Sequence, residues 1–354
     1  MSFKNAIAIL SIMLGVLISC GSPNEKQSDE KSEETAGAGE VNIYSHRHYD
    51  SDKELFKLFT EKTGIKVNVI KASADELMNK MEVEGENSPA DVLLTVDAGR
   101  LYRAKAKDLL KPVSSETLEA NIPAQFRDSD NKWFGLTYRA RIIVYDKKKV
   151  TPDDLTTYED LTTEKWNGKV LIRSSGNIYN QSLLASIIEN SGRDAAKAWA
   201  AGVVGNMARE PKGNDRDQVK AIVEGLGEVA VVNTYYIGLL LNSENAEEVK
   251  AGEAVGIFFP NQDDRGAHVN VSGAGVAKYA PNEANAVKFL EFLSSEEAQK
   301  VFASVNYEYP VNASVEPAEL LKSWGEFKID QVDLNALGAN NKEAVLVFDE
   351  VGWK

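Results

Sequence analysis

Apolar positions along the chain follow two periods, one typical of strands and one typical of helices, and the two patterns alternate. Residues 41–45 (VNIYS) and 65–70 (IKVNVI) favour short strands, the second because apolar and polar positions alternate. Between them, apolar side chains recur at helical spacing over residues 52–62, and Gly64 predicts the end of that helix. Strands separated by helices predict parallel sheets joined by right-handed crossovers.

The same alternation continues through the rest of the chain. Ser73 and Glu76 form a capping box that predicts the start of a helix, and the apolar run at 91–96 predicts a buried strand. The remaining predicted elements are an extended segment at 133–146, a strand at 169–172, helices near 180–191, 194–205 and 216–225, strands at 228–233, 255–260 and 269–277, and helices near 283–291 and 295–304.

This order predicts an α/β fold of two lobes, with the chain crossing between them near 135–140 and returning near 256–262. We expect a first lobe of residues 41–137, completed by about 260–282. The second lobe should contain residues 138–259, with the helices of 283–354 packed near it. A chain of 354 residues is long enough for two such units, and a cleft between lobes is the usual place for a ligand.

The N-terminal segment predicts export. Residues 1–20 carry Lys4 ahead of an apolar stretch at 6–18, which is too short to cross a bilayer and typical of a signal peptide. The stretch ends at Cys20 and resembles a bacterial lipoprotein signal, in which that cysteine is lipidated; an ordinary signal peptide with an incidental cysteine is the alternative. Residues 21–40 contain no large apolar side chain and predict a disordered acidic tether. We therefore expect a protein anchored by lipid to the periplasmic or cell-surface face of a bacterial membrane.

Charge and residue counts exclude several classes of function. With 54 acidic against 40 basic residues, the net charge is −14, which argues against nucleic acid as a partner and limits membrane contact to the lipid anchor. The single cysteine excludes an internal disulfide and a cysteine metal cluster, and a site of several histidines would need all of His46, His48 and His268. The chain also lacks a nucleophile elbow, a phosphate-binding loop and an H-E-x-x-H motif, so the sequence does not favour an enzyme.

Tyrosines and one histidine follow three of the predicted strands, at the edge where ligands bind in open α/β sheets. The strands in question are 41–45, 169–172 and 228–233. Two adjacent tyrosines would point to opposite faces of a strand, but they converge at a turn from strand to helix. The alternative is aromatic packing against the sheet. The residues that these strand ends deliver are His48, Tyr49, Tyr179, Tyr235 and Tyr236.

Phenolate oxygens suit a hard trivalent cation, which prefers hard anionic donors. A bound cation also lowers the pKa of a phenol and so removes its proton near neutral pH. Four phenolates and one neutral imidazole around Fe³⁺ would leave a single net negative charge. Arg139 or Arg141, at the predicted crossing between lobes, could neutralise it; ordinary surface ion pairs are the alternative for these arginines.

Several segments resemble the ferric-iron-binding proteins of bacterial and cyanobacterial ABC importers. The resemblance extends over residues 41–354 and is carried by VNIYSHRHYDSDKELFKLFTEKTGIKVNVI, LTYRARIIVYD, RSSGNIYNQSLLAS, VVNTYYIGLLLNS, FPNQDDRGAHVNVSGAGVAKYAPN and EAVLVFDEVGWK. It implies a type II periplasmic binding protein with transferrin-like lobes, which is a monomeric binder and not an enzyme. Its cargo would be Fe³⁺, free or as a ferric chelate, and its partner an ABC permease and ATPase complex.

The resemblance also implies the metal ligands. They fall on His48, Tyr49, Tyr179, Tyr235 and Tyr236, with His46 standing where the family pattern has a small residue. Members with fewer tyrosines recruit carbonate or phosphate, and the charge of four phenolates predicts that this chain needs no such synergistic anion. Two alternatives remain open: a binding protein of the same fold for an organic anion, a polyamine or an oxyanion, and a metal-dependent hydrolase using the same cleft.

Overall fold

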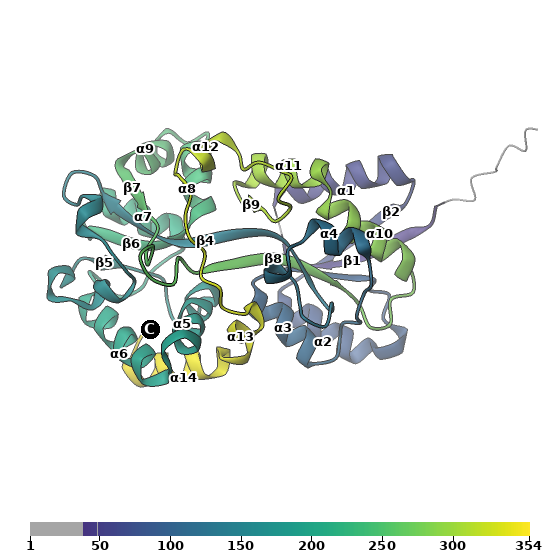
Figure 1. Ribbon diagram of the computed structural model, residues 1–354, viewed down its shortest axis with the longest axis horizontal. Coiled ribbons are helices and arrows are strands. Elements are labelled where there is room, and N and C mark those ends of the chain that lie inside the picture. The colour runs from purple at the N-terminus through teal and green to yellow at the C-terminus, as the bar shows by residue number, and fades with distance from the viewer. Residues whose placement is uncertain (1–37, 48) are drawn as a thin grey trace, which may run out of the picture. The chain divides into compact units, whose positions relative to one another are not determined.

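The computed structural model describes residues 38–47 and 49–354, which form a mixed β-sheet covered by helices (Figure 1). The predicted signal peptide, Cys20, nearly all of the tether at 21–40 and the predicted ligand His48 lie outside the described residues. Within those residues, no helix combines the length and the apolar character that crossing a bilayer requires.

The first lobe is built on three parallel strands. The central strand β1 pairs with β2 on one side and β3 on the other, so their carboxyl ends lie at one edge of the sheet. Gly64 ends the first helix in the left-handed conformation, and Ser73 and Glu76 form the predicted capping box. The elements of this part are β1 (Glu40–Ser45), α1 (Asp50–Thr63), β2 (Lys66–Lys71), α2 (Ala74–Glu84), β3 (Val92–Val96), α3 (Ala98–Ala106) and α4 (Glu116–Asn121).

The second lobe contains a parallel pair, β5 and β6, and a larger set of helices. Two helices, α5 and α6, pack against each other and against α14 on one side, and α7, α8 and α9 contact one another (Figure 1). The elements are β5 (Val170–Leu171), α5 (Ile178–Ser191), α6 (Arg193–Asn206), α7 (Asp215–Val223), β6 (Val229–Asn233), α8 (Thr234–Leu241), α9 (Ala246–Ala254) and β7 (Val255–Phe258).

Two long strands join the lobes. The first half of β4 (Phe134–Asp146) pairs with β8 (Val269–Val276) and β9 (Tyr309–Pro310), and its second half pairs with β6 and β7. The strand order β2-β1-β3-β8-β4-β6-β5 therefore runs through both lobes. All pairings of β4 and β8 are antiparallel, so the predicted parallel sheets hold only for the strands within each lobe. The strands that cross between lobes run against their neighbours because the chain returns in the opposite direction.

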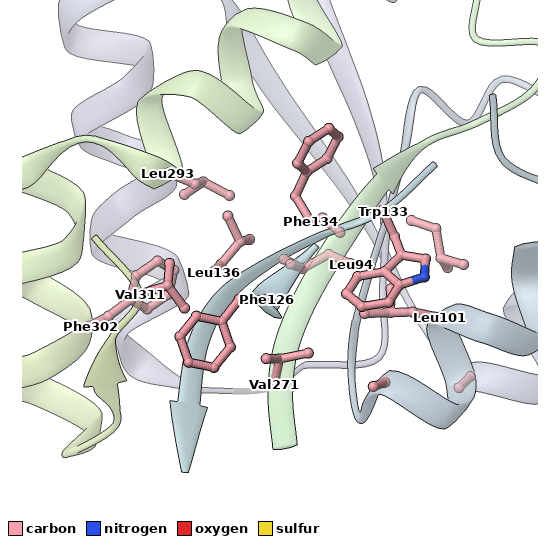
Figure 2. Packing of buried hydrophobic residues seen from close by; sticks show 14 of the residues in the cluster. Leu94, Leu101, Phe126, Trp133, Phe134, Leu136, Val271, Leu293, Phe302 and Val311 are labelled. Atoms are coloured by element: carbon pink, nitrogen blue, oxygen red, sulfur yellow. The ribbon is translucent and has the colours of Figure 1, made fainter. Parts of the chain in front are cut away.

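Buried aromatic and aliphatic side chains hold this joint together. Trp133, just before β4, lies beside Leu101 of α3, whereas Phe134 and Leu136 of β4 point to the opposite side of the sheet from Val271 of β8 (Figure 2). All five side chains are fully buried. Burying a large apolar side chain stabilises the fold by about 1.5–3 kcal/mol, so this cluster fixes where β4 leaves the first lobe. The position of β4 decides where its later residues reach the ligand cleft.

The C-terminal helices are divided between the lobes. Helix α10 (Glu283–Ser294) contacts α4 and β1, and α11 (Glu296–Asn306) packs on α1, whereas α14 (Asn341–Val351) packs on α5 and α6. Helix α13 (Leu334–Ala339) contacts both α3 and α5, and the short α12 spans Glu319–Lys322. Helix α14 therefore packs on helices of the second lobe, and α10 and α11 pack on elements of the first.

Candidate functional site

The four predicted tyrosines come together between the lobes. The hydroxyl oxygens of Tyr179 and Tyr235 lie 3.1 Å apart, and the rings of Tyr235 and Tyr236 have centroids 4.2 Å apart. Tyr49 of the first lobe meets Tyr235 edge-on, with centroids 6.3 Å apart. The adjacent tyrosines converge as predicted because β6 passes directly into α8 at this point. We call Tyr49, Tyr179, Tyr235 and Tyr236 the tyrosine cluster.

Each tyrosine of the cluster stands at the beginning of a helix. Tyr49 is the N-cap of α1, and Tyr235 and Tyr236 lie in the first turn of α8. Tyr179 lies in the first turn of α5, where the Asn177 side chain accepts a hydrogen bond from its backbone N–H at 3.1 Å. The positive end of a helix dipole favours a nearby negative charge, so three helix starts make this region favourable for anionic groups.

A cavity of about 300 Å³ opens beside the tyrosine cluster. Its walls come from both lobes, since α1 and α11 belong to the first and α5, α7 and α8 to the second. The other lining residues are Ser51, Arg216, Leu239, Val305 and Asn306. The volume accommodates a metal ion together with a small organic ligand.

Burial keeps the phenols of Tyr49, Tyr235 and Tyr236 protonated in the absence of a cation. It is the main cause of the raised pKa of Tyr49, of Tyr235 and of Tyr236, and the neighbouring Tyr179 raises all three further. Arg47 lowers the pKa of Tyr49, and Arg139 lowers that of Tyr235, but neither offsets burial. A cation that binds here must therefore displace protons, and it must be charged strongly enough to do so.

Three arginines surround the ring of Tyr179. The guanidinium carbons of Arg139, Arg173 and Arg141 lie 5.4, 5.7 and 5.9 Å from its centroid. Arg139 and Arg141 are buried, so the alternative of surface ion pairs is wrong for both. Arg141 pairs with Asp215 at 3.0 Å. Positive charge is thus built in beside the tyrosine cluster, on the strand that crosses between the lobes.

Arg139 belongs to a buried network that joins the lobes. Its guanidinium lies 3.8 Å from the carboxylate of Asp97, which follows β3 in the first lobe. Asp97 accepts hydrogen bonds of 2.9 Å from Ser182 of α5 in the second lobe and from Asn270 of β8. Burial raises the pKa of Asp97, although Arg139 lowers it. Because Ser182 lies one turn beyond Tyr179, this carboxylate ties the first lobe to the helix that carries a tyrosine.

Arg47 is the corresponding cation of the first lobe. Its guanidinium carbon lies 4.8 Å from the centroid of the Tyr49 ring. Asp52 accepts hydrogen bonds from its Nε at 3.2 Å and its Nη2 at 2.9 Å, and Glu308 lies 3.8 Å from its Nη2. All three side chains are buried. Arg47 thus places a positive charge beneath Tyr49, as Arg139 does beside Tyr179.

The two histidines that the structure describes lie in different positions relative to the tyrosine cluster. His48 lies outside the described residues, and His46 is half-buried, with its backbone N–H donating to Leu94. His268 is buried and lines a small enclosed space together with Arg139, Arg141 and Tyr179. Burial and the neighbouring arginines lower its pKa to about 3, so it is neutral. His268 therefore stands behind the tyrosine cluster and not on the surface.

Sequence reasoning missed several charged residues of the site. Arg47 and Asp52 lie five positions apart, just after a predicted strand. This spacing could have been used to predict an ion pair at the ligand-binding edge. Asp97 also directly follows a predicted strand. Glu308 gave no such signal, because only the tertiary fold brings it beside Arg47.

The arrangement is suited to a hard cation. Two oxygens 3.1 Å apart can contact one ion at usual metal–oxygen distances, and the nearby arginines compensate for phenolate charge. Among residues 38–47 and 49–354, no group of three or more His, Cys, Asp or Glu side chains is placed to hold a metal.

Comparisons with known proteins agree on one class. A family model described as bacterial extracellular solute-binding protein matches residues 54–329. Over 340 residues the chain is 51% identical to the iron uptake protein A1 of Synechocystis sp., a match that covers 96% of this chain and 93% of that protein.

Solved structures agree with this result. A Trichodesmium protein (IdiA, FutA) in complex with iron and citrate ligands superposes with a TM-score of 0.87 at 52% identity, covering 89% of this chain and 100% of that one. The ferric binding protein from Campylobacter jejuni superposes with a TM-score of 0.84 at 48% identity, with the same coverage. The predicted two-lobed fold is therefore confirmed, and these neighbours are solute-binding proteins and not enzymes.

Proposed function

This chain belongs to the family of bacterial extracellular solute-binding proteins, and we propose on that premise that it binds Fe³⁺ for import by an ABC transporter. The observation that carries the proposal is the tyrosine cluster, in which phenols from both lobes meet at the beginnings of three helices. Relatives named as iron uptake and ferric binding proteins support the same cargo.

The proposed ligands are the phenolates of the tyrosine cluster together with His48. Arg139 and Arg141 supply the positive charge that balances the surplus of phenolates, since both lie within 6 Å of the Tyr179 ring. Binding converts buried phenols into phenolates, so each ferric ion releases protons and binds more tightly as pH rises. A divalent ion drives this deprotonation less strongly, which favours Fe³⁺.

The proposed cellular role is capture outside the cytoplasm. The chain would be exported, cleaved before Cys20 and anchored there by lipid, with residues 21–40 as a tether. As a monomer it would close its lobes on iron by hinge motion and deliver the ion to the permease and ATPase complex. Tyr49 meets Tyr235 across the cleft, which fits a closed state in which both lobes contribute ligands.

The test is an optical titration of residues 21–354 with Fe³⁺, comparing wild type with a Tyr235→Phe/Tyr236→Phe variant. We expect a visible phenolate-to-iron charge-transfer band that saturates at one equivalent in wild type and is lost or shifted in the variant. The matched control is Tyr138→Phe/Tyr309→Phe, a stacked pair of tyrosines outside the cluster, which should leave the band unchanged. A folded wild type without the band would refute the proposed function.

A second candidate is an organic anion as the cargo itself. It is favoured by Arg216, which lines the cavity, and by Arg173 beside Tyr179. One relative was solved with both iron and citrate. A wild type that shows no iron band, but whose melting temperature rises with citrate alone, would make this the better assignment.

A further inference from the structure

Two residues that follow α14 lie against the loop that leads to Tyr179. They are Trp353 and Lys354, and α14 itself packs on α5 and α6 (Figure 1). The loop consists of residues 173–177, between β5 and α5, and we call it the β5–α5 loop. Tyr179 lies in the first turn of α5, so any shift of this loop moves the backbone that carries its phenol.

Two hydrogen bonds join these residues to the β5–α5 loop. The indole Nε1–H of Trp353 donates to the backbone oxygen of Arg173 at 3.0 Å. The backbone oxygen of Lys354 accepts a hydrogen bond from the N–H of Ser175 at 2.9 Å. Arg173 is only half-buried and Ser174 is exposed, so packing alone does not fix this stretch. The backbone of the loop is therefore held by a segment about 180 positions further along the chain.

Trp353 is itself held in one place by its neighbours. Its side chain is buried, and the centroid of its ring lies 4.8 Å from that of Phe348 and 5.9 Å from that of Trp199. Both neighbours belong to the same buried apolar cluster. A buried indole usually has a partner for its N–H, and here the packing directs that N–H at the loop. Trp353 thus connects the position of the loop to that of the core.

The same loop is held from the side of α5. The side-chain amide of Asn180 donates to the backbone oxygen of Arg173 at 2.7 Å, and its Oδ1 accepts from Arg141 at 2.9 Å. One carbonyl thus receives a donor from Trp353 and a donor from the residue next to Tyr179. The guanidinium carbon of Arg173 lies 5.7 Å from the centroid of the Tyr179 ring. The backbone of Arg173 therefore influences both the phenol and a cation beside it.

We propose that Trp353 is a positioning residue for the tyrosine cluster. Through its hydrogen bond to Arg173 it fixes the β5–α5 loop, and so it holds Tyr179 and the Arg173 guanidinium in place before any cargo binds. The inference rests on the proposed function and adds to it a residue outside the cluster. A site whose groups are already in place binds more tightly, because less conformational freedom is lost on binding. Loss of the indole N–H should therefore weaken Fe³⁺ binding.

The experiment compares Trp353→Phe with Trp199→Phe. Trp199 is the matched control, because it is similarly buried, contacts Trp353 and also donates its Nε1–H to a backbone oxygen, that of Tyr158, at 2.8 Å. Each substitution removes one indole N–H and keeps an aromatic ring, so the two variants should lose similar amounts of stability. Only the hydrogen bond of Trp353 leads to the β5–α5 loop.

The first measurement is Fe³⁺ affinity, from the charge-transfer band with nitrilotriacetate as competitor. We expect the affinity to fall about three- to tenfold in Trp353→Phe, the effect of one hydrogen bond, and less than about twofold in Trp199→Phe. The band of iron-loaded Trp353→Phe should also shift, because the Tyr179 phenolate changes its orientation. A loss of stability alone would lower the melting temperature and leave the band of the loaded protein in place. Equal affinities and equal bands in the two variants would overturn the inference.

A readout without iron distinguishes this inference from the proposed function. Hydrogen exchange at the Ser175 amide of the iron-free protein, followed by NMR, should be faster in Trp353→Phe than in wild type and unchanged in Trp199→Phe. If no protein shows a charge-transfer band while this difference is seen, the iron assignment fails and the positioning role remains. If Trp353→Phe does not fold, wild type decides alone: a Ser175 amide that exchanges as fast as an exposed, unbonded amide would overturn the inference.

Discussion

The two sides of the tyrosine cluster are built differently. The second lobe contributes three tyrosines from the beginnings of α5 and α8. The first lobe contributes Tyr49, an N-cap of α1 that makes no side-chain capping hydrogen bond. The second lobe thus contributes side chains from two helix starts, and the first lobe contributes one side chain from the start of a single helix.

The supports behind the two sides differ as well. In the second lobe, Arg141 on β4 donates to Asp215 of α7, to Asn180 of α5 and to Asn233 of β6, so one guanidinium joins four elements. In the first lobe, Arg47 is held mainly by Asp52, only five residues further along the chain. Cross-linking distant elements fixes their relative positions, whereas a local pair fixes only its own loop.

This difference indicates that the two lobes have different roles in binding. Under the proposed function, the second lobe would present three of the four phenolates in a fixed arrangement, and the first lobe would complete the site by hinge closure. The Tyr49 ring, which meets Tyr235 edge-on, would then be the part of the cluster that depends on closure. Proteins that close by hinge motion need one lobe that can engage the cargo first.

Removing the central arginine of the second lobe should have the largest effect. Arg141→Met leaves Asp215 buried without its cation, and breaking a buried pair in this way costs about 3–5 kcal/mol of unfolding free energy. The measurement is urea denaturation of the iron-free protein. The control is Lys220→Met, which breaks a half-exposed pair with Glu248 in the same lobe and should cost about 0–1 kcal/mol. Similar costs for both variants would remove the basis for a fixed second lobe.

Much of this fold could be predicted from the sequence, because its signals are local. The capping box of Ser73 and Glu76, the helix end at Gly64 and the extended segment that became β4 all depend on a few neighbouring residues. The tyrosines could be found for the same reason, since each follows a strand and lies at the beginning of a helix. That they act as metal ligands stays a prediction.

The rest of the site could not be predicted, because it depends on contacts between distant segments. Glu308 and Arg47 are neighbours only because β9 pairs with β4 and α11 packs on α1. The antiparallel strands that cross between lobes have the same apolar pattern as parallel ones, so periodicity did not reveal their direction. The placement of α10 and α11 on the first lobe likewise depends on which apolar surface each helix meets.

A smaller effect on stability should come from His268, which immediately precedes β8. Burial, followed by the charges of Arg139, Arg141 and Arg265, lowers its pKa from 6.5 to about 3. Below pH 6.5 the His268 imidazole is protonated in the unfolded chain but stays neutral in the folded protein. The stability of the folded state therefore falls as pH decreases. Between pH 7 and 5 this loss amounts to about 2 kcal/mol.

The measurement for His268 is chemical denaturation of iron-free wild type and His268→Gln at both pH values. The pH-dependent loss of stability should be about 2 kcal/mol smaller in the variant, and titration of all other groups largely cancels in the comparison. Equal losses in the two proteins would mean that burial and the neighbouring arginines do not lower the pKa of this imidazole in the folded state.

The smallest effect tests the helix starts themselves. Asn177→Ala removes the cap of α5 beside Tyr179, and Ser73→Ala removes the cap of α2 in the first lobe, away from the cluster. Each should lower the unfolding free energy by about 1 kcal/mol, because each leaves a backbone donor without its side-chain acceptor. Only Asn177→Ala should also weaken Fe³⁺ binding in the optical titration, since only that cap fixes the backbone of a proposed ligand. Equal weakening by both variants would show that general stability, and not the preformed second lobe, governs the affinity.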